Sequence, residues 1–297
     1  MLNIVGKRKI WFILSGVLVA IALLAIGVWH FKESAEFKGG TLWEFSVVAE
    51  NPPLTTMQTF FAQGLGVSNA QISYDSQHQL FIAQLDVIDE TTHQGLLGKL
   101  KAQYPSFQEL SFQAIGPSVG AALEKNAIIA IFLVLIGISL YIAFAFRKTS
   151  RPVSSWKYGW ITLLTLFHDV SIPAGLLAIL GHVKGVEIDT NALVALLVVM
   201  GFSVHDTIVV FDRVRENLLA NRGKVKFAEI VNQSVNQTLA RSINTSLTLI
   251  LVLVALLFVG PADLVYFMLI LLVGVTTGIY SSIFIASPML VAVSREE

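Results

Sequence analysis

The sequence contains no cysteine, and charged residues occupy only 13% of its 297 positions. The missing cysteine excludes a disulfide framework and any metal site held by thiolates. Soluble domains carry about 25% charged residues, so the shortage of charge points to a membrane protein. Basic and acidic residues balance at 20 each. This balance argues against a nucleic-acid partner bound through bulk charge.

Apolar residues fill the chain instead, at 55% of the sequence and a mean hydropathy of +0.71. A bilayer core of about 30 Å needs roughly 20 apolar residues per helix. Segments of that length are 10–29, 127–146, 158–180, 192–211, 240–259 and 264–286. The sequence therefore predicts an α-helical integral membrane protein with six transmembrane helices in a lipid bilayer.

Lysine and arginine gather before the first span, between the second and third, and between the fourth and fifth. These residues are Lys7, Arg8, Lys9, Arg147, Lys148, Arg151, Lys157, Arg213, Arg215, Arg222, Lys224 and Lys226. Because cytoplasmic loops are enriched in Lys and Arg, both termini are expected in the cytoplasm. The first apolar run exceeds the core of a signal peptide, which is about 7–15 residues long, so we expect a retained anchor.

One long soluble segment separates the first two spans, and this topology places it outside the cytoplasm. Its predicted elements are a strand at 37–48, a helix at 54–65, a hairpin of 70–74 and 80–87 around Asp75-Ser76-Gln77, a helix from an Asp89 cap to Gln103, and a strand at 107–115. The order βαββαβ is ferredoxin-like. The predicted domains are 1–30 (N-terminus and first transmembrane helix), 31–124 (external ferredoxin-like domain) and 125–297 (helices 2–6 with cytoplasmic loops).

Asp206 in the fourth span is the main candidate for function. A carboxylate at this depth costs about 2.5–3.5 kcal/mol on insertion scales and tends to face a partner or a water-filled cavity. At about 1.5 Å per residue, Asp206 lies roughly 25 Å from Asp189, and Arg241 lies roughly 28 Å from Gly260. The similar depths make Arg241 the expected partner. The pair is either a proton switch, worked by approach and withdrawal of the guanidinium, or a static ion pair or interhelical hydrogen bond that fixes packing.

Three other ionisable residues lie within the spans. Asp169 either extends a proton relay toward the outer side or bonds a neighbouring backbone or hydroxyl group. His168 and His205 each precede an aspartate by one residue, about 100° of helix rotation, so a histidine and its neighbour cannot both point straight at one partner. Histidine titrates near neutrality, which suits a weak relay role. A packed, hydrogen-bonded histidine is the commoner case.

Other polar groups have simpler interpretations. Small residues in spans four and six permit close helix contact. They are Gly201, Ser203, Thr207, Gly274, Thr276, Thr277, Gly278, Ser281 and Ser282. Residues 212–217 are expected to pair within their helix, and 224–239 are expected to form an interfacial helix. Gly39 and Gly40 indicate a bulge or a close backbone approach in a strand.

Five motifs occur in order along nearly the whole chain. They are Phe37-Lys38-Gly39-Gly40-Thr41, Gly116-Pro117-Ser118-Val119-Gly120, His168-Asp169-Val170, the stretch 201–217, and Thr238-Leu239-Ala240-Arg241-Ser242. Together they resemble the SecF family of the bacterial Sec protein translocase, within the resistance–nodulation–division superfamily. Glu36 stands where the family usually has Asp, and His205 where it commonly has Asn. The second departure places a titratable group beside the key carboxylate.

The resemblance implies an auxiliary, non-enzymatic subunit of the Sec export machinery in the bacterial inner membrane. Its partners would be SecD, the SecYEG channel and exported polypeptides. It would be driven by the proton gradient without a cofactor or metal, and the resemblance gives Asp206 and Arg241 the proton-carrying role. The residues expected to be structural in the family motifs are Phe37, Gly39, Gly40, Thr41, Gly116, Pro117 and Gly120. The alternatives are a small-molecule exporter of the same superfamily and a non-transporting scaffold of the translocase.

Overall fold

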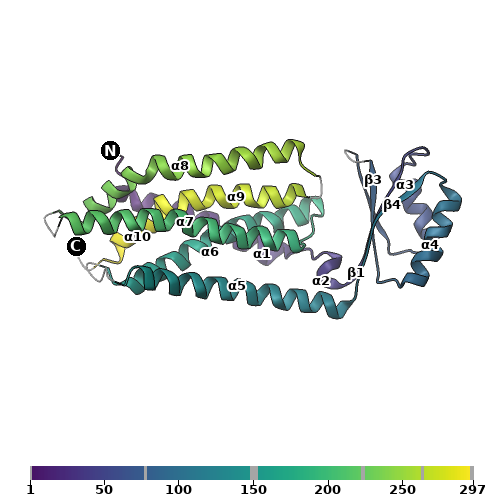
Figure 1. The fold of residues 1–297 in the computed structure, drawn as a ribbon, viewed down its shortest axis with the longest axis horizontal. Coiled ribbons are helices and arrows are strands. Elements are labelled where there is room, and N and C mark those ends of the chain that lie inside the picture. Colours follow the sequence, from purple (N-terminus) through teal and green to yellow (C-terminus); the bar gives the residue numbers. More distant parts are fainter. Residues whose placement is uncertain (1, 77–78, 148–152, 222–224, 262–263, 295–297) are drawn as a thin grey trace. The chain divides into compact units, whose positions relative to one another are not determined.

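The computed structural model describes residues 2–76, 79–147, 153–221, 225–261 and 264–294 (Figure 1). The chain forms two compact units, one of residues 33–128 and one of residues 1–32 together with 129–297. Several residues used in the sequence predictions lie outside the described ranges. They are Gln77 of the hairpin turn and the basic residues Lys148, Arg151, Arg222 and Lys224.

Within the described residues, six helical segments are long and apolar enough to cross a membrane, which confirms the predicted number. They are η1 (Val5–Lys7) continued by α1 (Arg8–Trp29), α5 (Pro117–Ala145), α6 (Ser155–Lys184), α7 (Thr190–Asn221), α8 (Phe227–Val259), and α9 (Val265–Ser281) continued by a π-helical stretch, Ser282–Ala286, and α10 (Ser287–Ala292). Most exceed the predicted spans, because the helices continue past the apolar run into polar sequence.

Helices α6, α7 and α9 form the centre of the helical unit. About half of the most apolar part of each is buried inside the protein, against 17% for α1, α5 and α8. Small residues bring α9 against α7, because a Cβ on Gly274 would lie 2.7 Å from Cγ1 of Val199. On Gly278 it would lie 3.2 Å from Cα of Ser203. The predicted role of small residues is confirmed here, whereas Gly201 has no neighbour within 4 Å of its Cβ position.

Helix α8 corrects one prediction. The stretch expected to be a separate interfacial helix, 224–239, is described from Val225 onward and belongs to the same helix as the fifth span from Phe227. No proline or glycine interrupts the sequence between Phe227 and Val259, so nothing ends the helix at the membrane surface. Its 33 residues extend for about 50 Å, more than the hydrocarbon core needs.

The smaller unit contains a four-stranded antiparallel sheet in the order β2-β3-β1-β4. Its elements are β1 (Gly40–Val47), α3 (Leu54–Thr59) continued by a π-helical stretch (Phe60–Gly64), β2 (Gln71–Asp75), β3 (Leu80–Leu85), α4 (Glu90–Gln103) and β4 (Phe107–Ile115). They follow the predicted order β–α–β–β–α–β. Figure 1 shows α3 and α4 on one face of the sheet, where Trp43, Phe45 and Leu100 are fully buried in the core.

The strand predicted at 37–48 begins only at Gly40. Residues Ala35–Lys38 form a short helix, α2, in which the side chain of Ser34 accepts a hydrogen bond from the amide of Glu36. Gly39 then adopts a positive φ of 80°, a conformation that glycine adopts without strain. Gly39 therefore turns the chain between α2 and β1, and its predicted place in a strand is wrong.

The two glycine motifs pack against each other. A Cβ on Gly39 would lie 2.7 Å from Cα of Pro117, and one on Gly120 would collide with the carbonyl oxygen of Phe37. Thr41 is fully buried, and its hydroxyl accepts a hydrogen bond from the amide of Ile88 at 3.2 Å. The predicted close approach is therefore present, between the start of β1 and the first turn of α5.

Candidate functional site

Asp169 is a fully buried carboxylate at the centre of the helical unit. It comes from α6, and its Oδ1 lies 2.8 Å from Nδ1 of His168. Its Oδ2 accepts hydrogen bonds from Ser281 of α9 at 2.6 Å and from Ser203 of α7. One carboxylate therefore joins the three central helices. Of the two alternatives for Asp169, bonding to hydroxyl groups is present in the structure, and the relay remains a prediction.

The ring of His168 is also buried. Among the described residues, no group hydrogen-bonds to its Nε2, and its ring lies 6.1 Å from that of Tyr280. Because an ionised carboxylate can only accept, Nδ1 carries the proton when Asp169 is charged, and Nε2 is then a free acceptor or an unpaired donor. The pair therefore has more than one place for a proton.

The π-helical stretch Ser282–Ala286 begins directly beside this carboxylate. Ser281 bonds to Asp169, whereas the next residue, Ser282, lies 2.8 Å from the hydroxyl of Thr207 on α7. Farther along, the hydroxyl of Ser287 donates to the carbonyl of Ser282. Such π-helical turns occur frequently at functional sites. The sequence contained only the small residues as a signal here, and it did not indicate the change in helix type.

Asp206 faces a different neighbour. It is 2% exposed, and its Oδ2 accepts a hydrogen bond of 3.1 Å from Ser246 on α8. Its Oδ1 lies 3.7 Å from Nδ1 of His205, whose side chain is 61% exposed. Asp206 therefore bonds toward α8, whereas Ser203 and Thr207 of the same helix bond toward α6 and the segment after α9. Sequence reasoning missed Ser246.

The expected partnership of Asp206 with Arg241 is not formed. Among the described residues, no ion pair joins the two side chains, and Arg241 is exposed. Ser246, which reaches Asp206, lies five residues farther along α8, or about 7.5 Å. The estimate from the sequence assumed parallel helices with matching ends, and this assumption hid the offset.

A polar cavity of about 360 Å³ lies between α7 and α8 beside Arg241. Its lining residues are Val209, Asp212, Arg213, Glu216, Gln237, Thr238 and Arg241. Two ion pairs within α7, Arg213–Glu216 at 2.6 Å and Arg215–Asp212 at 3.3 Å, confirm the predicted pairing along this helix. Val209 lies three residues beyond Asp206, a rise of about 4.5 Å. Polar surroundings therefore reach within one helical turn of the buried carboxylate.

Comparison with known proteins identifies the family. Residues 96–296, well over half of the chain, match the family "Protein export membrane protein SecD/SecF, C-terminal". Protein translocase subunit SecF of Thermobaculum terrenum is 40% identical over 301 residues, which covers 98% of this chain and 94% of that protein. Subunit SecDF of Thermus thermophilus is 33% identical, and the match covers 98% of this chain but only 38% of the relative.

A solved structure agrees. The crystal structure of SecDF from Thermus thermophilus, described as a translocon-associated membrane protein, matches with a TM-score of 0.82 at 33% identity over 98% of this chain and 38% of that one. SecDF in its super-membrane-facing form matches with a TM-score of 0.69 at 32% identity, over the same shares of the two chains. The chain therefore belongs to the SecF family of protein translocase subunits and is a multi-pass inner-membrane protein.

Proposed function

We propose that this protein is an auxiliary subunit of the Sec export machinery that uses the proton gradient to promote polypeptide translocation across the inner membrane. The observation that carries the proposal is Asp206, a buried carboxylate in a membrane-spanning helix that bonds across to a Ser246 hydroxyl. A serine hydroxyl stabilises a buried charge far less than a cation does. Binding or release of a proton at Asp206 would therefore change the relative stability of different arrangements of α7 and α8.

Arg241 supplies the second half of the switch. In this structure its guanidinium lies at the polar cavity, away from Asp206. A shift of α8 that brings Arg241 toward Asp206 would stabilise the charged carboxylate and release its proton. Withdrawal of Arg241 would favour uptake of the next proton. The polar cavity between α7 and α8 would give this exchange access to water on one side.

Asp169 is the second proton-carrying residue in this proposal. With His168 it offers two neighbouring places for a proton, and its hydroxyl partners come from two other helices. A change of charge at Asp169 would therefore alter the packing of α6, α7 and α9 together. His205, exposed and near Asp206, and His168 have the weaker role of passing protons to these carboxylates.

We infer the partners from the relatives and the orientation from the distribution of Lys and Arg. In SecDF the counterpart of this chain is part of a much longer protein, so we assign SecD as the partner, with SecYEG and exported polypeptides as further partners. Both termini are placed in the cytoplasm and residues 31–124 outside it. The translocase names of these relatives favour this function over small-molecule export. A non-transporting scaffold is the remaining alternative.

Asp206→Asn tests the proposal in a reconstituted complex with SecD. The variant removes the titrating group and keeps the size of the side chain, so we expect normal assembly and loss of the gradient-dependent increase in secretion and of proton flux. Asp86→Asn changes an exposed carboxylate of the smaller unit and should leave both unchanged. Undiminished gradient-driven export in Asp206→Asn would reject the motor and leave the scaffold.

A further inference from the structure

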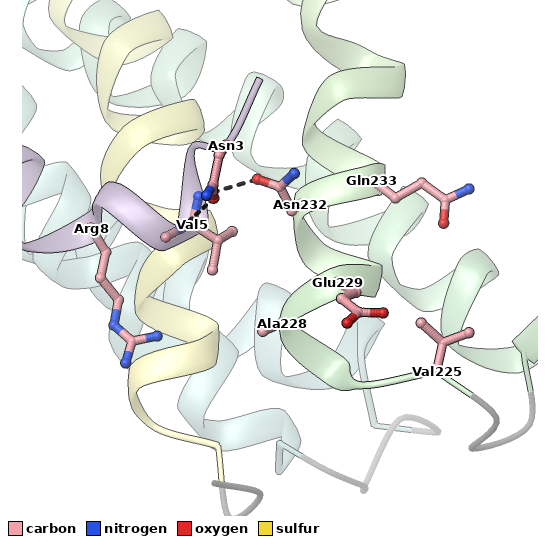
Figure 2. A pocket seen from close by; sticks show the side chains of 9 residues that line it. Asn3, Val5, Arg8, Val225, Ala228, Glu229, Asn232 and Gln233 are labelled. Atoms are coloured by element: carbon pink, nitrogen blue, oxygen red, sulfur yellow. Dashed lines mark hydrogen bonds between the residues drawn. The ribbon is translucent and has the colours of Figure 1, made fainter. Parts of the chain in front are cut away.

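The end of the bundle that holds the N-terminus contains a pocket of about 540 Å³ (Figure 2). It lies between the N-terminal segment and the first turns of α8. Its lining residues are Asn3, Val5, Gly6, Arg8, Val225, Ala228, Glu229, Asn232 and Gln233. None of them belongs to the carboxylate sites described above, so the proton-driven function does not account for this pocket.

The wall of the pocket is held in place by Asn232 and Asn236 of α8. The side-chain oxygen of Asn232 accepts hydrogen bonds from the amides of Ile4 at 2.9 Å and Val5 at 3.2 Å. Both asparagine side-chain amides donate to the carbonyl of Leu2. The side chains of Ile4 and Val5 are buried in the core. The pocket is therefore preformed and needs no ligand to assemble it.

Two side chains of opposite charge, Arg8 and Glu229, line this pocket. Arg8 begins α1 and Glu229 lies in the first turn of α8, and Figure 2 shows their side chains on separate elements. Within the described part of the chain, neither side chain has a hydrogen bond or ion pair to another residue. A purely anionic ligand would be attracted by Arg8 and repelled by Glu229. A ligand that carries both charges satisfies both side chains.

The depth of the pocket matches the headgroup layer of a bilayer. Glu229 lies 30 residues before Val259 at the other end of α8, or about 45 Å, close to the full bilayer thickness of about 40–45 Å with its headgroups. Ile10, Ile13 and Val17 are also exposed on α1, but at about 100° per residue they lie on the face of the helix opposite Arg8, so the contacts of this site are those to the headgroup.

We propose that this pocket binds the headgroup of a zwitterionic aminophospholipid such as phosphatidylethanolamine. Arg8 would bind the phosphate, and Glu229 would accept hydrogen bonds from the primary ammonium group. Such charge-assisted bonds are stronger than neutral ones. Phosphatidylcholine carries the same charges but has no N–H donors for Glu229, and phosphatidylglycerol has no cation. The site should therefore discriminate between these three headgroups.

Native mass spectrometry of the full-length protein, with the three lipids added at equal concentration, tests this site. We expect phosphatidylethanolamine to be retained about tenfold better than the other two, the difference that one charge-assisted contact of about 1.4 kcal/mol supplies. Glu229→Gln should abolish this preference and keep binding of phosphatidylglycerol. Arg8→Gln should weaken binding of phosphatidylethanolamine and of phosphatidylglycerol. Lys9→Gln, at the exposed neighbouring position, should change the ratio between the retention of these two lipids less than twofold.

Each other outcome overturns the proposal. Equal retention of the three lipids, or an unchanged preference in Glu229→Gln, would show that Glu229 does not read the headgroup. Preference for phosphatidylglycerol would indicate a simple contact between basic residues and anionic lipid. Competition by soluble phosphoethanolamine at the concentration of the lipid would make the ligand a free metabolite. Glu229 is exposed, so its substitution should leave the fold intact, as thermal unfolding would verify.

Discussion

At the scale of single residues, Glu90 in the first turn of α4 shows how local hydrogen bonds lower the pKa of a carboxylate. Its Oε1 accepts a hydrogen bond of 2.6 Å from the amide of Gln94, and its Oε2 lies 3.3 Å from Nδ1 of His93. The hydrogen bond from Gln94 has the larger effect and the contact with His93 the smaller one, and together they hold the pKa of Glu90 below its ordinary value of 4.5. His93 itself is buried, and its Nε2 lies 2.6 Å from Glu109 on β4.

The lowered pKa of Glu90 predicts how the stability of the smaller unit depends on pH. A carboxylate with a depressed pKa stabilises the fold above its ordinary pKa, and this contribution is lost as the pH falls through the lower value. Thermal unfolding followed between about pH 6 and pH 3 should therefore show a smaller loss of stability in Glu90→Gln than in the native protein. Glu124→Gln, at an exposed position of α5, should keep the native profile. Identical profiles for native protein and Glu90→Gln would contradict the assignment.

The two buried carboxylates of the helical unit show what sequence can and cannot predict at this scale. Asp206 and Asp169 are evident from the sequence because charged groups inside apolar spans are rare. Their partners are not evident, since a hydroxyl such as that of Ser246 is as ordinary on a packing surface as at a functional site. Whether Arg241 meets Asp206 depends on the offset of two helices, which counting along each helix does not provide.

At the scale of elements, the contact between α7 and α9 depends on one glycine. A Cβ at Gly274 would press into the side chain of Val199, whereas Gly201 has open space. Gly274→Ala should therefore destabilise the helical unit by about 1–3 kcal/mol through overpacking. Gly201→Ala should be neutral or slightly stabilising, because alanine favours helices more than glycine does.

Unfolding of the two variants in mixed micelles measures this difference, and their secretion activity shows whether the contact also matters for function. Equal stability of Gly274→Ala and Gly201→Ala would show that α9 can move away from α7 at little cost. The close packing of Gly274 against Val199 would then contribute little to the stability of the helical unit.

The ends of helices and strands could be predicted from the sequence where local interactions determine them. Strand β4 was predicted at its observed bounds, and the Asp89 cap of α4 is confirmed by its 2.8 Å bond from the amide of Thr92. In these places local chemistry decides the structure. The start of β1 was misplaced because Gly39 turns the chain to meet Pro117, some 80 residues away. A glycine is the only signal of such a long-range contact that the sequence provides.

At the scale of the whole molecule, the polar cavity predicts which positions water reaches. The chain has no cysteine, so single cysteines can be introduced without background. Val209 lines the cavity, whereas its neighbour Val210 is fully buried. A hydrophilic thiol reagent should therefore modify Val209→Cys readily and leave Val210→Cys unmodified.

The same experiment tests the proposed orientation. Val209→Cys should react in inverted vesicles, which expose the cytoplasmic face, and be protected in spheroplasts. Gln108→Cys, on the exposed surface of β4, should show the opposite pattern. Labelling of both variants from one side would refute the placement of the smaller unit outside the cytoplasm.

The hydrogen bonds that Asn232 and Asn236 donate to Leu2 also have a consequence for biosynthesis. At a translation rate of about 5–20 residues per second, these asparagines are made roughly 10–50 s after Leu2. The segment around Leu2 must therefore stay unattached while four hydrophobic segments enter the membrane. Its capture by α8 is a late event in assembly, and a bulky fusion partner before Leu2 would hinder the step that closes this end of the bundle.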